Sequence, residues 1–110
     1  MKKSTINIEV ELDENQVPEK IVWDAEDTGT GLAESKAMML AFWDKKEANT
    51  MRMDLWTKEM MVDEMKMFYH QTLLTMADSF DRATGEAEMS QDLRDFCDYF
   101  AERMKIKPEV

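Results

Sequence analysis

Two kinds of hydrophobic periodicity divide the chain into an N-terminal and a C-terminal part. Residues 5–12 (TINIEVEL) alternate between polar and apolar side chains, which predicts a strand with one buried face. Residues 20–24 (KIVWD) predict a second strand that completes a hairpin with the first. Residues 37–43 (AMMLAFW) and 50–57 (TMRMDLWT) predict a second hairpin, joined by the polar segment DKKEAN.

The side chains of the second hairpin predict its register. If Trp43 lies opposite Thr50, one face of the hairpin is entirely apolar. A slip of one residue would place Phe42 opposite Thr50 and mix the two faces, so the first register is preferred. In that register the reverse face carries Met39, Trp43 and Trp56, which makes it more apolar than a solvated sheet face.

Beyond residue 62 the apolar residues recur every three or four positions, a spacing typical of amphipathic helices. We expect helices over about residues 62–84 and 88–105, with Gly85 ending the first. Asp78 and Arg82 are spaced as an ion pair one helical turn apart. The apolar stripe of the first helix consists of Val62, Met65, Tyr69, Leu73, Met76, Phe80 and Ala83.

The order of these elements predicts an α+β fold: a four-stranded antiparallel sheet of two hairpins, followed by two C-terminal helices packed on one face. The length of 110 residues suits a single domain over residues 1–110. The longest apolar run has seven residues, far fewer than a membrane span requires, and we expect a cytoplasmic location without membrane insertion. The single cysteine, Cys97, excludes an internal disulfide and a zinc site built from thiolates.

The chain has 14 basic and 24 acidic residues, a formal net charge of −10. This charge argues against nucleic acid as a partner, because phosphate binding needs a basic patch. An anionic membrane surface is disfavoured for the same reason. The second helix also carries a row of acidic residues, interpreted as a solvated face, with a cation or a basic partner as the alternative; these are Asp92, Asp95, Asp98 and Glu102.

Residues 23–31 (WDAEDTGTG) raise the question of a calcium site. Their acidic residues match the first and third ligand positions of a twelve-residue calcium loop. The twelfth position, however, holds Ser35 in place of the bidentate Glu that such a loop needs. An acidic turn is the preferred interpretation, and we do not expect cation binding at Asp24, Glu26 and Asp27.

The sequence offers little material for an active site. His70 is the only histidine, and position 67, three residues earlier, is Met instead of the Glu of a helical metal pair. One histidine and one cysteine give no nucleophile–base triad. We therefore expect no enzyme activity, no cofactor, and no catalytic, cofactor-binding or metal-ligating residue. A deep pocket holding His70 with two acidic neighbours would reverse this expectation.

Twelve methionines are a high count, and methionine is over-used at adaptable binding surfaces as well as in cores. Most of them lie on the predicted core stripes. Met67 and Leu74 are seven residues apart and form a second apolar strip on the first helix. Five apolar side chains placed off the core form a candidate contact surface for a protein partner or for self-association: Met39, Trp43, Trp56, Met67 and Leu74.

Three long stretches carry a resemblance to a known family: VELDENQVPEKIVWDAED, MRMDLWTKEMMVDEMKMFYHQTLLTMADSFDRATG and RDFCDYFAE. They resemble the gliding motility-associated protein GldC family of the Bacteroidota, over about residues 6–104. The resemblance implies a small soluble cytoplasmic protein associated with the gliding machinery, with no enzyme activity or cofactor. Members of the family commonly have Pro where this chain has Met61, and Pro at that position would suit the first turn of the predicted helix.

Two functional hypotheses follow. The first is a non-enzymatic protein-interaction module, a cytoplasmic accessory protein associated with bacterial gliding motility. The alternative is a SecB-like oligomeric chaperone or holdase that binds unfolded or export-bound clients. It rests on analogy alone, because four antiparallel strands followed by two helices is also the order of elements in the SecB export chaperone.

Overall fold

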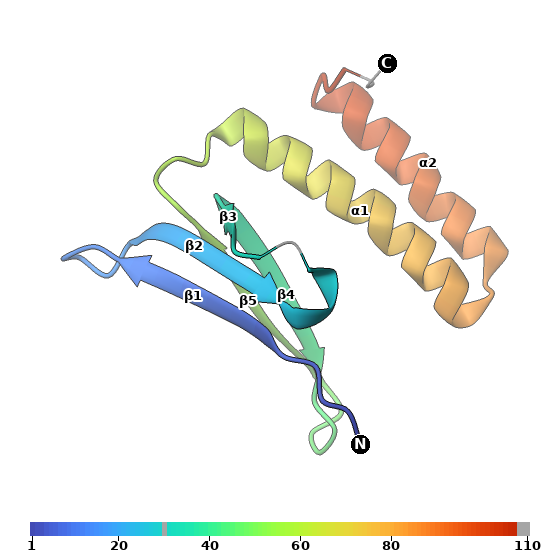
Figure 1. The fold of residues 1–110 in the computed structure, drawn as a ribbon. Helices are drawn as coiled ribbons and strands as arrows, with labels where there is room; N and C mark the ends of the chain where they lie inside the picture. Colours follow the sequence, from blue (N-terminus) through green and yellow to red (C-terminus); the bar gives the residue numbers. More distant parts are fainter. Residues whose placement is uncertain (30, 108–110) are drawn as a thin grey trace. The chain divides into compact units, whose positions relative to one another are not determined.

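A computed structural model describes residues 1–29 and 31–107 of the chain, without the side chain of Thr28. The chain divides into two compact units, Met1–Met60 and Met61–Val110. The first unit contains the strands and the second contains the helices (Figure 1). The single domain expected over residues 1–110 stays a prediction, and each unit is described by itself below.

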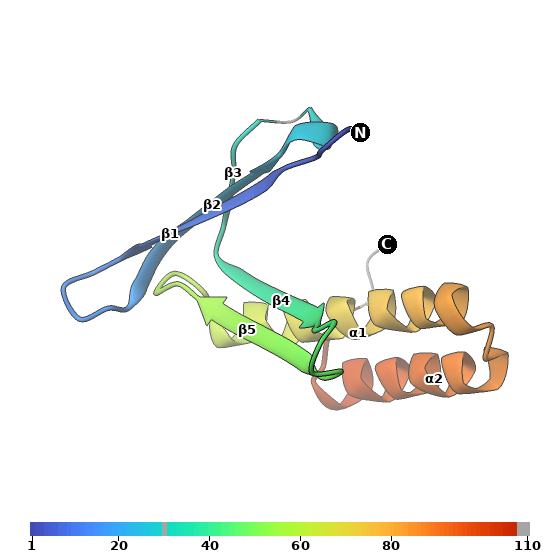
Figure 2. The same cartoon turned by 90° about the horizontal axis from the view of Figure 1, so that it is seen from below.

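The described residues of the first unit form two antiparallel sheets. The first sheet has three strands in the order β1-β2-β3. The second sheet consists of β4 and β5, which lie side by side (Figure 2). A short 3-10 turn, η1, connects β2 to β3. The elements are β1 (Ile6–Leu12), β2 (Pro18–Ala25), η1 (Glu26–Thr28), β3 (Ala33–Ser35), β4 (Ala37–Trp43) and β5 (Thr50–Trp56).

The predicted α+β class, the two antiparallel hairpins and the two C-terminal helices are confirmed. The sheet differs in detail, because β3 was not predicted. Its three residues are too few to show an alternating pattern, yet they pair with β2, placing Ile21 opposite Ser35 and Trp23 opposite Ala33. The strands consequently form sheets of three and two instead of one sheet of four. Packing of the helices on one face stays a prediction.

The register predicted for the second hairpin is confirmed, and the first hairpin, for which no register was predicted, pairs as follows. In the first, Ile8 lies opposite Trp23 and Val10 opposite Ile21, so the apolar residues of β1 share a face with those of β2. In the second, Trp43 lies opposite Thr50. The remaining pairs therefore follow in the expected order: Met38 with Leu55, Leu40 with Met53, and Phe42 with Met51.

Asp13 fixes the turn between β1 and β2. Its Oδ1 accepts hydrogen bonds from the N–H groups of Asn15 (2.7 Å) and Val17 (2.9 Å). The Nζ of Lys58 forms an ion pair with Oδ2, the other carboxylate oxygen of Asp13. The Asp13 side chain is only 13% exposed. The Lys58 ammonium, and after it the Val17 N–H, hold the pKa of Asp13 below its ordinary value of 3.8.

The second unit is an antiparallel helical hairpin of α1 (Val62–Thr84) and α2 (Ala87–Arg103). The first helix has the predicted bounds, and Gly85 ends it in the left-handed conformation (φ 70°), with its N–H bonded to the Asp81 carbonyl at 2.8 Å. The second helix ends two residues before the predicted boundary. Lys105 has a left-handed φ of 57°, which turns the chain out of the helix.

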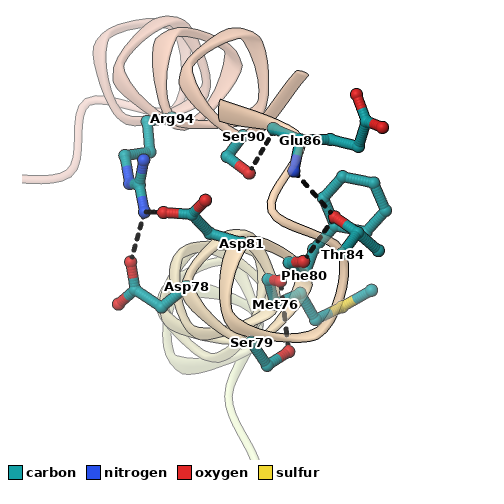
Figure 3. Close-up of polar contacts among 9 residues, drawn as sticks. All are labelled: Met76, Asp78, Ser79, Phe80, Asp81, Thr84, Glu86, Ser90 and Arg94. Carbon is teal, nitrogen blue, oxygen red and sulfur yellow. Dashed lines mark hydrogen bonds and ion pairs between the residues drawn. The ribbon is translucent and has the colours of Figure 1, made fainter. Parts of the chain in front are cut away.

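Arg94 joins the two helices. Its Nη2 donates to Asp78 Oδ1 at 3.1 Å and to Asp81 Oδ2 at 3.4 Å, as Figure 3 shows. The predicted pairing of Asp78 with Arg82 is therefore replaced by a pairing with a residue of the other helix. Spacing along one helix could not reveal this partner, because it depends on how α2 folds back on α1.

Few hydrophobic side chains are fully buried. Among the described residues they are Ile21, Ala77 and Cys97. Ala77 and the Arg94 partners lie on the side of α1 that contacts α2. The predicted apolar stripe lies on a neighbouring side and is partly exposed, with Val62 at 71% and Met76 at 54%. The helical hairpin therefore buries a narrower strip of α1 than the apolar periodicity provides.

Candidate interaction surfaces

One face of the β4–β5 hairpin carries both tryptophans of the second sheet. Cross-strand pairing and alternation place on it Ala37, Met39, Ala41, Trp43, Thr50, Arg52, Asp54 and Trp56, which we call the tryptophan face. Trp43 is 70% exposed and Trp56 is 56% exposed, whereas Met39 is half-buried. Arg52 Nη2 and Asp54 Oδ1 are 3.0 Å apart, so opposite charges balance in the middle of this face.

The two tryptophans lie at opposite ends of the hairpin. Trp56 pairs with Ala37, six positions along β4 from Trp43. At the usual rise of a strand this separates the two Cα positions by roughly 20 Å. Met39 lies between them. A single partner that contacts both indoles must therefore span the length of the hairpin.

The reverse face of this hairpin, which we call the apolar face, carries no polar side chain; it consists of Met38, Leu40, Phe42, Met51, Met53 and Leu55. Phe42, Met51 and Met53 are between 52% and 60% exposed. Met38 and Leu40 are half-buried and line an apolar pocket of about 170 Å³. The other residues lining that pocket are Ile6, Ile8, Ile21, Trp23, Ser35 and Met39.

Trp56 also borders a groove that the sequence did not suggest. The groove has a volume of about 500 Å³ and is lined by Val17, Pro18, Asp54, Leu55, Trp56, Thr57, Lys58 and Met60. Part of its wall is the end of the β1–β2 turn, formed by Val17, whose N–H donates to Asp13, and by Pro18, the first residue of β2. A polar connection in the sequence gives no sign of such a wall, because the turn geometry positions these two apolar residues.

The remaining two predicted residues, Met67 and Leu74, lie in the second unit. Both line a groove of about 460 Å³ with His70, Gln71, Asp98, Ala101, Ile106 and Lys107. The five predicted residues therefore fall into two groups, three on the tryptophan face and two in this helical groove. Met67 and Leu74, which the seven-residue spacing predicted to form one strip, line the same groove, and their role as a contact surface stays a prediction.

His70 was the residue most relevant to catalysis. Its ring stacks on Phe100, with centroids 6.1 Å apart and an angle of 15° between the planes. Asp98 is the one acidic residue that lines its groove, where we required two to favour a catalytic site. Within the described ranges there is no group of three side chains that could hold a metal ion.

The acidic turn is divided between two elements. Asp24 belongs to β2, and Glu26 and Asp27 belong to η1. The Ser4 hydroxyl donates a hydrogen bond to Asp27 Oδ2 at 2.6 Å, so this carboxylate helps to position the N-terminal segment. Thr30 and the side chain of Thr28, which belong to the same stretch, lie outside the described residues.

In the part of the chain that the structure describes, neither helix is long and apolar enough to span a membrane. No curated protein and no solved structure matches the chain. A family model does match, that of the gliding motility-associated protein GldC-like proteins, over residues 18–106. This match covers most of the chain and agrees with the resemblance of its long sequence stretches. The chain belongs to the gliding motility-associated protein GldC-like family.

Proposed function

We propose that this chain is a non-enzymatic protein-interaction module, a cytoplasmic accessory protein of the gliding machinery. The family supplies the association with gliding motility. The observation that carries the molecular role is the tryptophan face, where two indoles are more than half exposed on one side of a two-stranded sheet. Exposed tryptophans of this kind are typical anchors of protein interfaces, because they bury a large area at a small cost in side-chain entropy.

The geometry of this face limits the kind of partner. The anchors Trp43 and Trp56 are separated by roughly 20 Å, so the partner needs two apolar pockets at that spacing. Between the anchors, the Arg52–Asp54 pair offers both charges in balance. A net charge of −10 on the whole chain discourages acidic surfaces, which favours a neutral or basic partner.

The absence of enzyme activity is part of the same proposal. It is supported by the environment of His70, which stacks on Phe100 and has one acidic neighbour in its groove. The SecB-like alternative gains no support from the fold, since five strands in two sheets weaken the analogy on which it rested.

The test is capture of a partner by the tagged full-length chain from the cytoplasm of a gliding bacterium, with identification by mass spectrometry. We compare the wild type with the double variant Trp43→Ser/Trp56→Ser. The matched control is Met51→Ser, a residue of the apolar face that is 59% exposed. One dominant gliding-machinery protein, retained by Met51→Ser and lost by the tryptophan variant, supports the proposal. Equal capture by a folded tryptophan variant contradicts it.

A further inference from the structure

A groove runs along one side of the helical hairpin, and apolar and polar side chains line it together. Met67 is 44% exposed in this groove, whereas Leu74, Ala101 and Ile106 are half-buried. The groove has a volume of about 460 Å³, and its polar lining residues are His70, Gln71, Asp98 and Lys107. An apolar floor with a polar rim is the usual form of a surface that binds another protein segment.

The end of α2 builds one wall of the groove. Lys105 adopts a left-handed φ of 57°, and the Ile106 N–H then donates to the Ala101 carbonyl at 2.8 Å. The Lys105 N–H also donates to the Glu102 carbonyl at 3.2 Å, so the two bonds form the Schellman motif that ends many helices. In this motif the residue after the left-handed position packs on the last turn of the helix. Ile106 is thereby held at the groove before a partner binds, which lowers the entropy cost of binding.

The floor of the groove suits contact with a helix. Met67 and Leu74 are seven residues apart on α1, so their Cα atoms are separated by about 10 Å, or two helical turns. Residues 61–107 form helices and no strand, so this unit offers no sheet edge and a partner has to bind it through side chains. A helix presents side chains on one face every three or four residues and can pack along the groove between two antiparallel helices.

Carboxylates follow the α2 side of the groove. Asp95, Asp98 and Glu102 are spaced three and four residues apart, which places them on one side of α2. All three are exposed, and within residues 1–29 and 31–107 no basic side chain pairs with them. Arg94 is instead turned toward two carboxylates of α1, and Lys107 follows the end of α2. The α2 side of the groove is therefore acidic.

We propose that this groove binds an amphipathic helix of a partner protein, with apolar side chains on one face and lysine or arginine residues along the edge that meets α2. The apolar face covers Met67 and Leu74. Basic side chains three or four residues apart then match the spacing of Asp95, Asp98 and Glu102. This pairing relieves the repulsion among the three carboxylates. The site is separate from the tryptophan face and does not depend on the proposed gliding role.

Fluorescence anisotropy with a synthetic peptide tests the site. The probe is a fluorescein-labelled peptide of about 18 residues, with leucine at every third or fourth position, lysine beside the leucines and alanine elsewhere. Its control carries glutamate in place of each lysine. We expect the lysine peptide to bind the full-length chain at physiological salt and the glutamate peptide to remain unbound. A lysine peptide that does not bind, or equal binding of both peptides, would overturn the proposal.

Paired variants separate this groove from a general attraction of the acidic chain for basic peptides. Asp98→Asn/Glu102→Gln should weaken binding about threefold to tenfold, because two exposed ion pairs are lost. Glu9→Gln/Glu11→Gln removes the same charge from β1 and should change binding by less than about twofold. Equal weakening by the two double variants would mean that only the net charge attracts the peptide, and would refute the groove as its site.

Apolar variants test the floor of the groove in the same way. Met67→Ser should weaken binding about fivefold, because the peptide then covers less apolar area. The matched control, Met76→Ser, is 54% exposed and lies on another side of α1, so it should bind as the wild type does. Trp43→Ser/Trp56→Ser should also bind normally. Circular dichroism checks that each variant is folded. Full binding by a folded Met67→Ser, or loss of binding in either control, would place the peptide outside the groove.

Discussion

Trp43 and Trp56 lie on the same face of the β4–β5 hairpin, yet Trp56 pairs with Ala37, six positions from Trp43. Within one chain the two indoles are too far apart to interact, so their replacements should have additive effects on the free energy of unfolding.

A double-mutant cycle tests this additivity. Urea unfolding of the wild type, Trp43→Ser, Trp56→Ser and the double variant gives the four free energies of unfolding. We expect the two single effects to add to within about 0.5 kcal/mol. Coupling larger than this would place the indoles in contact within one chain, in conflict with the pairing of Trp56 with Ala37.

The turn between β4 and β5 contains a residue in a strained conformation. Ala48 has a φ of 52°, in the left-handed region, and its N–H bonds to the Asp44 carbonyl at 3.1 Å. Ala48→Gly should stabilise the protein by about 0.5–1 kcal/mol, because relief of strain exceeds the entropy that glycine loses on folding. Lys46→Gly, in the same turn and without a positive φ, should destabilise it by about 0.5 kcal/mol. Thermal unfolding of the two variants distinguishes these effects, and a shift of both in the same direction would contradict the explanation.

The ion pair between Asp13 and Lys58 should make stability depend on pH at the acid end. The folded pKa of Asp13 lies below 3.8, so its contribution is complete above that value and is lost as the pH falls through the folded pKa. Asp13→Asn should therefore reduce the drop in thermal midpoint between about pH 4 and about pH 2. An identical drop in both proteins would show that this carboxylate does not link the first hairpin to Lys58.

The same ion pair should also make stability depend on pH at the alkaline end, where stability falls as the pH rises. Asp13, and to a smaller extent Glu19, raise the pKa of Lys58 above 10.5. Its contribution is complete below 10.5 and is lost as the pH rises through the higher folded pKa. The Asp13→Asn variant should lose less stability than the wild type in this range as well.

The thiol of Cys97 reports on the helical unit. Cys97 is 1% exposed, and burial, with a smaller effect of Asp98, raises the pKa of its thiol above 9.0. The folded protein should therefore react slowly with a thiol reagent at pH 8, with a rate that rises steeply on adding urea. A rapid reaction without denaturant would mean that α1 and α2 separate readily.

Alternation and turn length decided what could be predicted in the first unit. The parity of the apolar residues excluded a slip of one residue, and the observed pairing of Phe42 with Met51 agrees with the register predicted for β4 and β5. β3 was not, because Ala33–Ser35 is held by pairing with β2 and carries no pattern of its own. The spacing of Met67 and Leu74 predicted an apolar strip on the first helix but no groove, because the groove that they line also includes Asp98 and Ile106, which only the folded helical hairpin brings there.

Periodicity also predicts which side of a helix is apolar without predicting what covers it. The stripe that includes Val62 and Met76 was expected to be the core of α1, and yet both residues are more than half exposed, while Ala77 on the next side is buried. Whether a second layer covers this stripe depends on contacts beyond the helical hairpin. A pattern within one helix contains no information about them.

The contact of Arg94 with Asp78 gives a direct comparison between prediction by spacing and prediction by structure. Spacing along α1 selected Arg82 as the partner of Asp78, whereas the structure places Arg94 Nη2 at 3.1 Å from Asp78 Oδ1 and at 3.4 Å from Asp81 Oδ2. The Arg94 guanidinium lies between two carboxylates of α1. It should therefore contribute more to the free energy of unfolding than the Arg82 guanidinium, which is on the same helix as Asp78. The Arg94 side chain is 33% exposed, so the effect should be modest and should weaken in salt.

We therefore expect Arg94→Met to lower the thermal midpoint more than Arg82→Met does. The difference should shrink when the salt concentration is raised to about 1 M, because the Debye length falls to about 3 Å. Methionine keeps an unbranched apolar side chain at both positions, which limits the comparison to the lost charge and hydrogen bonds. If the two variants lose equal stability at low salt, the Arg94 contact does not hold α2 against α1. If Arg82→Met lowers the thermal midpoint more than Arg94→Met does, the pair predicted from spacing, Asp78 with Arg82, is the stronger one.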